Sequence, residues 1–93
     1  MIFEWDEAKS LRTFAERGFD FARAARVFAD EHRLERKDTR RDYGEDRFQA
    51  VGEVDGKTYF VAFTRRGDAV RIISARRAHA QEDRVYREGK ART

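Results

Sequence analysis

Cysteine and proline are both missing from this 93-residue chain, and it contains only two histidines. Without cysteine the chain can form no disulfide, no thiolate nucleophile and no zinc-finger type of metal site. His32 and His79 lie far apart in the sequence, so they form no recognisable metal-binding motif. We therefore expect no metal ion and no other cofactor.

Long apolar runs are also missing. No segment approaches the roughly 20 apolar residues that a membrane-spanning helix requires. The N-terminal residues 1–6 lack the basic and then apolar segments of a signal peptide. We expect a cytoplasmic protein that does not enter a membrane. Repeats and linkers are absent, so residues 1–93 are expected to form one domain, with residues 88–93 as a flexible tail.

Charge, in contrast, is abundant and unevenly distributed. Charged residues make up 42% of the chain. From Arg65 to the C-terminus there are nine Lys or Arg and four Asp or Glu, a balance of +5, whereas the first 64 residues hold twelve and fourteen, a balance of −2. This asymmetry indicates a polyanionic partner, which is RNA or an acidic protein that covers the same surface. Most of the cations are arginine, whose planar guanidinium binds two phosphate oxygens at once.

The first half of the chain predicts a short strand and two helices. Residues 2–5 have strand character, and Asp6 is a suitable N-cap for a helix over residues 7–16. Gly18 can end that helix in the left-handed conformation. The helix has apolar residues at helical spacing, which we expect to face the core: Ala8, Leu11, Phe14 and Ala15. A second helix, capped by Asp20 and closed by Asp30, has a continuous apolar stripe: Phe21, Ala24, Ala25 and Phe28.

The second half predicts strands, then one helix. The Asp55-Gly56 pair between two apolar runs is typical of a hairpin with a type I′ turn. We expect an edge strand over 32–37, a polar loop over 38–46, hairpin strands over 48–54 and 57–65, a turn at 66–68, a strand over 70–76 and a helix over 78–88. The result is an α+β fold with an antiparallel sheet of three or four strands. Helices cover one face of such a sheet, and we expect function on the open face.

Simple alternation along the last strand separates two sets of side chains. One set contains Val70, Ile72, Ser74 and Arg76, and the other contains Arg71, Ile73, Ala75 and Arg77. One arginine therefore ends each face of the strand.

The arginines near the last strand suggest a ribonuclease that needs no metal. Such an enzyme must stabilise the charge that develops on the scissile phosphate and must move two protons. Arg65, Arg76 and Arg77 are candidates for the first task, although the sequence leaves open whether they share one pocket. Glu82 and Tyr86, at i and i+4 of the last helix, are candidates for proton transfer, and Tyr86 also for stacking on a base. The alternatives are that Glu82 pairs with a nearby cation and that Tyr86 belongs to the core.

Two further cations are candidate RNA contacts. Lys9 lies one turn into the first helix, where it is either solvated or bound to a phosphate, and Arg71 lies on the last strand.

Several short segments, in their order and spacing, resemble the BrnT toxin family. These are Phe3-Glu4-Trp5-Asp6 with Lys9, Gly18-Phe19-Asp20-Phe21 with Ala24, Val27-Phe28-Ala29-Asp30, Gly44-Glu45-Asp46-Arg47-Phe48, and Arg71-Ile72-Ile73-Ser74-Ala75-Arg76-Arg77-Ala78 with Glu82 and Tyr86. The chain departs from the family pattern at Thr13, Arg17 and Asp83, where the family often has Asn, His and a basic residue.

This resemblance implies a RelE-like fold and a ribonuclease that inhibits translation. It also implies neutralisation by a BrnA-like antitoxin, whose ribbon-helix-helix domain dimerises and binds operator DNA, so that toxin and antitoxin form a heterotetramer. By position, the residues that match polar or basic places suited to RNA contact are Lys9, Arg65, Arg76, Arg77, Glu82 and Tyr86.

Two other functions are compatible with the same basic surface. The chain could be a binding module that holds nucleic acid by charge without cleaving it. It could also be a partner-binding protein whose basic face docks an acidic antitoxin helix.

Overall fold

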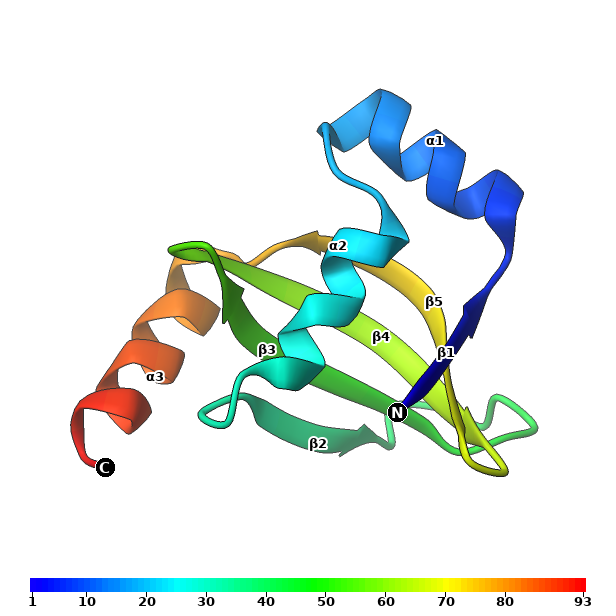
Figure 1. Cartoon of the computed structure of the whole chain (residues 1–93). Helices are drawn as coiled ribbons and strands as arrows, with labels where there is room; N and C mark the ends of the chain where they lie inside the picture. Colours follow the sequence, from blue (N-terminus) through cyan, green and yellow to red (C-terminus); the bar gives the residue numbers. More distant parts are fainter.

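A five-stranded mixed sheet with three α-helices forms the architecture of the computed structural model, which describes residues 1–93 (Figure 1). The strand order is β1-β5-β4-β3-β2. Strand β1 (Ile2–Trp5) pairs in parallel with β5 (Ala69–Arg77), and all other pairs are antiparallel. The α+β class is confirmed. The sheet has five strands instead of the expected three or four, because β1 also joins it by pairing in parallel with β5.

The predicted helix caps at the N-terminal end of the chain are confirmed. Helix α1 (Glu7–Arg17) begins after Asp6, whose carboxylate accepts from the backbone N–H of Ala8 and Lys9, and it ends at Gly18 with a φ of +83°. Helix α2 (Phe21–Ala25) continues as the 3-10 turn η1 (Arg26–Ala29), so the predicted second helix is present with a tightened last turn.

Helix α1 does not face the core as its apolar stripe predicted. Leu11 is 63% exposed and Phe14 is 57% exposed, and Ser10 is the one buried residue of the helix. The Ser10 hydroxyl accepts from the backbone N–H of Phe21 at 3.0 Å, which ties α1 to the start of α2. In Figure 1, α1 stands away from the sheet while α2 lies across it. The apolar stripe of α1 is thus left at the surface.

The strands of the second half follow the predicted order. They are β2 (Leu34–Asp38), β3 (Arg47–Val54), β4 (Lys57–Arg66) and β5. Strand β2 is an edge strand, as expected. The turn between β3 and β4 has positive φ at both central positions, +50° at Asp55 and +82° at Gly56. These values are those of the predicted type I′ turn.

The core lies between the sheet and the α2–η1 segment. Its largest fully buried apolar side chains include Phe21, Val27, Phe63 and Ile72. The backbone of β3 approaches η1 closely at Gly52, where a Cβ atom would lie 2.7 Å from Cγ1 of Val27. We call this side of the sheet the helix-covered face and the opposite side the open face.

A bulge in β5 changes which side chains share a face. Ile72 pairs with Phe63 and Ser74 pairs with Ala62, so Ile73 has no partner in β4. The predicted alternation was therefore wrong beyond Ile73. An extra residue in a strand makes each later side chain point to the opposite face from the one that simple alternation predicts. Val70, Ile72, Ala75 and Arg77 share the helix-covered face, whereas Arg71, Ser74 and Arg76 share the open face.

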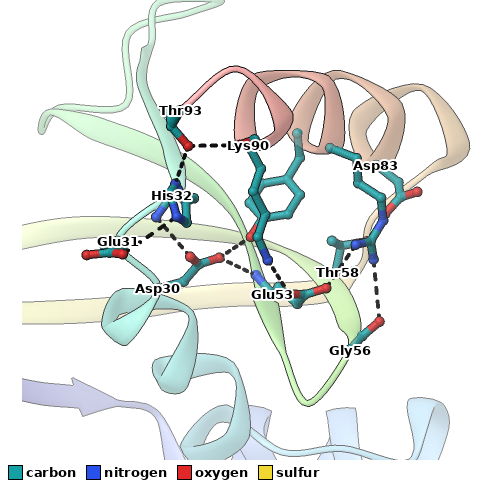
Figure 2. Close-up of polar contacts among 11 residues, drawn as sticks. Asp30, Glu31, His32, Glu53, Gly56, Thr58, Asp83, Lys90 and Thr93 are labelled. Atoms are coloured by element: carbon teal, nitrogen blue, oxygen red, sulfur yellow. Dashed lines mark hydrogen bonds and ion pairs between the residues drawn. The ribbon is translucent and has the colours of Figure 1, made fainter.

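Helix α3 (Ala80–Ala91) lies beside the hairpin end of the sheet. It begins two residues after the predicted start and continues to Ala91, so residues 88–91 are helical and not part of a tail. The extension is anchored because Nζ of Lys90 donates to Oε1 of Glu53 at 2.9 Å (Figure 2). None of the helices is long and apolar enough to cross a lipid bilayer.

Candidate phosphate-binding site

The three arginines that were candidates for one phosphate pocket lie in three different places. Arg65 pairs with Val70 in the sheet and Arg77 pairs with Tyr59, which places these two arginines at opposite ends of the helix-covered face. Arg76 is on the open face, because neighbouring residues of a strand point to opposite sides. Nη2 of Arg65 donates to Oε1 of Glu35 at 3.2 Å. The question that the sequence left open is answered by these positions, because the three arginines do not share one pocket.

Arg76 and Glu82 form a bidentate ion pair. Nη1 and Nη2 of Arg76 donate to the two carboxylate oxygens of Glu82 at 2.8 and 2.9 Å, and the guanidinium lies 4.0 Å from the ring centre of Phe60. The backbone N–H of His79 donates to the same carboxylate. The hydrogen bonds from Arg76 lower the pKa of Glu82 in spite of its partial burial. Pairing with Arg76 was one of the alternatives for Glu82, and its role in proton transfer stays a prediction.

Tyr86 is completely buried, and its hydroxyl donates to Oδ2 of Asp30. Burial, and then the Asp30 carboxylate, raise the pKa of Tyr86. The side chain is therefore neutral and has no surface that could stack on a base. Contact of Tyr86 with RNA does not fit this structure, and the alternative that it belongs to the core is the one observed.

The two other predicted RNA contacts already have partners within the chain. Nζ of Lys9 donates to the carbonyl oxygen of Ile73 in the bulge at 3.3 Å, and Nη1 of Arg71 lies 3.6 Å from Oε1 of Glu4. Their contact with RNA stays a prediction.

Arg77 lies in a polar pocket of about 460 Å³ at the hairpin end of the helix-covered face. We call it the basic pocket, and its lining is Phe14, Arg17, Gly18, Phe19, Asp20, Arg23, Lys57, Tyr59 and Arg77. Three of its four cations, Arg17, Lys57 and Arg77, form no ion pair with a carboxylate of this chain. Such unpaired cations are available to an anion from outside.

Tyr59 orients two of the arginines of the basic pocket. Nε of Arg23 donates to the Tyr59 hydroxyl at 3.1 Å, and the Arg77 guanidinium lies 5.5 Å from the centre of the Tyr59 ring. Nε of Arg77 also donates to the carbonyl oxygen of Thr58 at 3.1 Å, which leaves the two Nη groups of Arg77 free. The fourth cation, Arg23, forms an ion pair with Asp55 at the hairpin tip, where Nη2 of Arg23 lies 3.2 Å from Oδ2 of Asp55.

One carboxylate and one exposed aromatic ring complete the basic pocket. Oδ1 of Asp20 accepts from the backbone N–H of Arg23 as the cap of α2, and Oδ2 makes no hydrogen bond. Phe14 presents an exposed ring from α1. Cations beside an exposed ring are the combination with which proteins hold a phosphate and a neighbouring base.

Sequence reasoning identified Arg77 but missed Arg17, Arg23 and Lys57. These residues come from the end of α1, from α2 and from the start of β4, so no local spacing connects them. The one signal was the departure of Arg17 from the pattern of the resembling family. That difference drew attention to the position without assigning it to a site.

Residues 5–82 match the model of a family described as the ribonuclease toxin, BrnT, of type II toxin-antitoxin systems. The chain belongs to the BrnT family. The resemblance found in the sequence is therefore confirmed. No curated protein matches the chain significantly. The matched range includes the whole lining of the basic pocket, whereas most of α3 lies beyond it. A BrnT toxin is a ribonuclease, and membership of a type II system implies an antitoxin partner.

Proposed function

We propose that this BrnT protein cleaves RNA as an endoribonuclease without a metal cofactor, and that it holds the scissile phosphate in the basic pocket. One observation carries the proposal, which is that Arg17, Lys57 and Arg77 converge there without a carboxylate partner. In the cell, cleavage of RNA in the cytoplasm would inhibit translation.

The cations of the basic pocket would act on the negative charge that grows on the phosphate during cleavage. Guanidinium groups that are already in place stabilise such charge without reorganising. Arg77 is held by Thr58 and Tyr59 and can present both Nη groups to phosphate oxygens. Arg17 and Lys57 would add charge from two other sides.

Asp20 is the group in the basic pocket that we assign to the 2′-hydroxyl proton. Its Oδ1 is used by the helix cap, but Oδ2 is free to accept. Glu82 is the alternative from the sequence, although both of its oxygens accept hydrogen bonds within the chain. Asp20→Asn keeps a good N-cap residue and removes the base. A large loss of cleavage in Asp20→Asn with normal RNA affinity would support Asp20, whereas a large loss of cleavage in Glu82→Gln without weaker RNA affinity would support Glu82.

The antitoxin implied by the family is, in this proposal, a BrnA-like ribbon-helix-helix protein. Its dimer would hold two toxin chains in a heterotetramer and would supply all contacts to operator DNA. The net positive charge of the toxin, +3, favours a partner with an acidic docking segment. The mass of the purified complex and its binding to operator DNA, with and without the antitoxin, test this arrangement.

Cleavage of labelled RNA in EDTA is the central test. We expect the wild-type protein to cleave, and the double variant Arg17→Ala with Arg77→Ala to lose about 100-fold or more of the rate. Arg12→Ala is the control for Arg17→Ala, since it removes one positive charge from α1 outside the basic pocket. A folded double variant that cleaves at the wild-type rate would remove the basic pocket from the mechanism. Loss of wild-type cleavage in EDTA would refute the metal-free scheme, and RNA binding without any cleavage would favour the binding module.

A further inference from the structure

A second groove lies on the open face, between the sheet and α3. It has a volume of about 360 Å³, within the range of small-ligand sites. Its walls are Leu34, Val51, Phe60 and Val85, with Glu35, Arg36, Gln49, Gln81 and Glu82 as polar groups. An apolar slot of this size with amide and guanidinium groups at its edge has the chemistry to accept a nucleobase.

Beside the groove lies Arg76, a cation that can bind a phosphate and that contacts two lining residues, Phe60 and Glu82. The guanidinium carbon of Arg76 lies 4.0 Å from the ring centre of Phe60, and this contact holds the guanidinium group beside the slot. The Nη edge of Arg76 is turned to the two oxygens of Glu82 at 2.8 and 2.9 Å. A phosphate binds arginine in the same bidentate geometry as a carboxylate does. Glu82 therefore stands where a phosphate bound by Arg76 would stand.

We propose that the groove binds one nucleotide of an RNA strand and that Glu82 is a built-in competitor for its phosphate. The inference rests on the proposed function for the choice of RNA as the ligand. The base lies in the slot beside Phe60, and the phosphate replaces the Glu82 carboxylate on Arg76. The basic pocket and this groove lie on opposite faces of one sheet end, because Arg76 and Arg77 are consecutive in β5.

Glu82 can leave Arg76 without unfolding α3. Its Oε1 also accepts from the backbone N–H of His79 at 2.8 Å, which keeps the carboxylate at the helix start. The helix itself is attached elsewhere. Tyr86 is buried and its hydroxyl donates to Asp30, and Arg87 donates to Glu53 at 2.9 Å. Lys90 also donates to Glu53 at 2.9 Å (Figure 2).

Glu53 provides the matched control for Glu82. Glu53 accepts hydrogen bonds from two side-chain cations, and Glu82 accepts from one, Arg76, and from the backbone N–H of His79. Both carboxylates connect α3 to the sheet, but Glu53 does not line the groove. Replacing either by Gln removes one negative charge. If Glu82 competes with phosphate, only Glu82→Gln should bind nucleotide phosphate more tightly. If the cause is net charge or a loosened α3, both variants should show the same change in affinity.

The test measures binding of adenosine and uridine 5′-monophosphate, and of the corresponding nucleosides, by calorimetry. We expect Glu82→Gln to bind the monophosphates about tenfold more tightly than wild type, the effect of one charge-assisted hydrogen bond. We expect Glu53→Gln to match wild type, and Arg76→Ala with Glu82→Gln to lose the gain. The nucleosides should show no gain, since they lack the phosphate.

Two results would overturn the competitor hypothesis. One is an unchanged or weaker affinity of Glu82→Gln for both monophosphates, and the other is a gain that persists when Arg76 is also replaced. The variants of the basic pocket keep this test separate from the proposed function. If Arg17→Ala with Arg77→Ala abolishes RNA cleavage while Glu82→Gln gains no affinity, only the competitor hypothesis fails. If the pocket variant cleaves normally while Glu82→Gln gains affinity, only the proposed pocket fails.

Discussion

Arg76 and Arg77 are consecutive in β5, yet their guanidinium groups lie on opposite faces of the sheet. Arg76 is bound by the carboxylate of Glu82, whereas Arg77 lies over the Tyr59 ring and has no carboxylate partner. The two residues have the same chemistry and almost the same position in the sequence. Their availability to RNA nevertheless differs, because Arg76 forms an ion pair with Glu82 and Arg77 forms no ion pair.

The cations of the basic pocket should each contribute to the salt dependence of RNA binding. Each phosphate contact releases counter-ions, so Lys57→Ala should weaken RNA binding and reduce the slope of log affinity against log salt by about one. Lys37→Ala is the control, since Nζ of Lys37 already pairs with Asp46 at 3.1 Å and lies outside the basic pocket. Fluorescence anisotropy with a short RNA at several salt concentrations measures both slopes. Equal slopes for Lys57→Ala and wild type would exclude Lys57 from the RNA contact.

Phe14 should stack on a base next to the bound phosphate. Stacking on an aromatic side chain contributes about 1–3 kcal/mol per base, so Phe14→Ala should weaken binding of single-stranded RNA by roughly that amount. The ring is 57% exposed, so the free energy of unfolding should change little. Leu11→Ala, 63% exposed on the same helix, lacks a ring and lies outside the pocket, so RNA affinity should not change. Equal RNA affinities for both variants would mean that Phe14 does not stack.

Tyr86 should matter for stability and not for RNA chemistry. Tyr86→Phe removes the hydroxyl that donates to Asp30 and leaves the partly buried carboxylate with one donor fewer. We expect a loss of about 1–3 kcal/mol in the free energy of unfolding, measured by urea denaturation. RNA affinity and cleavage, measured well below the melting temperature, should match wild type. A normally stable Tyr86→Phe that no longer cleaves RNA would restore Tyr86 to the reaction.

Local chemistry was sufficient to predict the parts of the fold that depend on neighbouring residues. The two ends of α1 are set by Asp6 and Gly18, which bond to backbone groups only a few residues away. The hairpin turn is set by the positive φ values of Asp55 and Gly56 themselves. The pairing of β1 with β5 and the bulge at Ile73 depend on residues that are distant in sequence. No periodicity within either strand indicates them.

The same limit explains the incomplete prediction of the site. Arg77 was identified because it lies in an arginine-rich strand, whereas Arg17 and Lys57 are isolated cations in other segments. Only the folded chain brings them to Arg77. The apolar stripe of α1 predicted a buried helix, but in the structure it supplies Phe14 to the pocket wall instead.

Gly52 should be intolerant of a side chain, because its backbone packs against η1. The Cβ atom of Gly52→Ala would lie 2.7 Å from Cγ1 of Val27 and 3.3 Å from its carbonyl oxygen. Such overpacking typically costs about 1–3 kcal/mol. Gly89→Ala is the control, since its Cβ atom would meet no other atom within 4 Å and alanine favours a helix. Thermal melting should therefore show a lower melting temperature for Gly52→Ala and an equal or higher one for Gly89→Ala. The opposite order would mean that β3 and η1 are not packed as described.

The attachment of α3 should weaken in acid. Hydrogen bonds from Lys90 and Arg87 lower the pKa of Glu53, and those from Arg76 lower the pKa of Glu82. A carboxyl whose pKa is lower in the folded than in the unfolded chain stabilises the fold fully above its unfolded pKa of about 4.3. That contribution disappears as the pH falls through the lower, folded-state value.

We therefore expect the free energy of unfolding to fall as the pH drops below about 5, and to fall less steeply in Glu53→Gln, which starts from a lower stability at neutral pH. Glu88→Gln, in α3, is the control, because Glu88 is exposed and forms no ion pair. Urea denaturation at a series of pH values gives the three profiles. If Glu53→Gln and wild type lose stability in parallel, the ion pairs of Glu53 contribute nothing to holding α3 on the sheet.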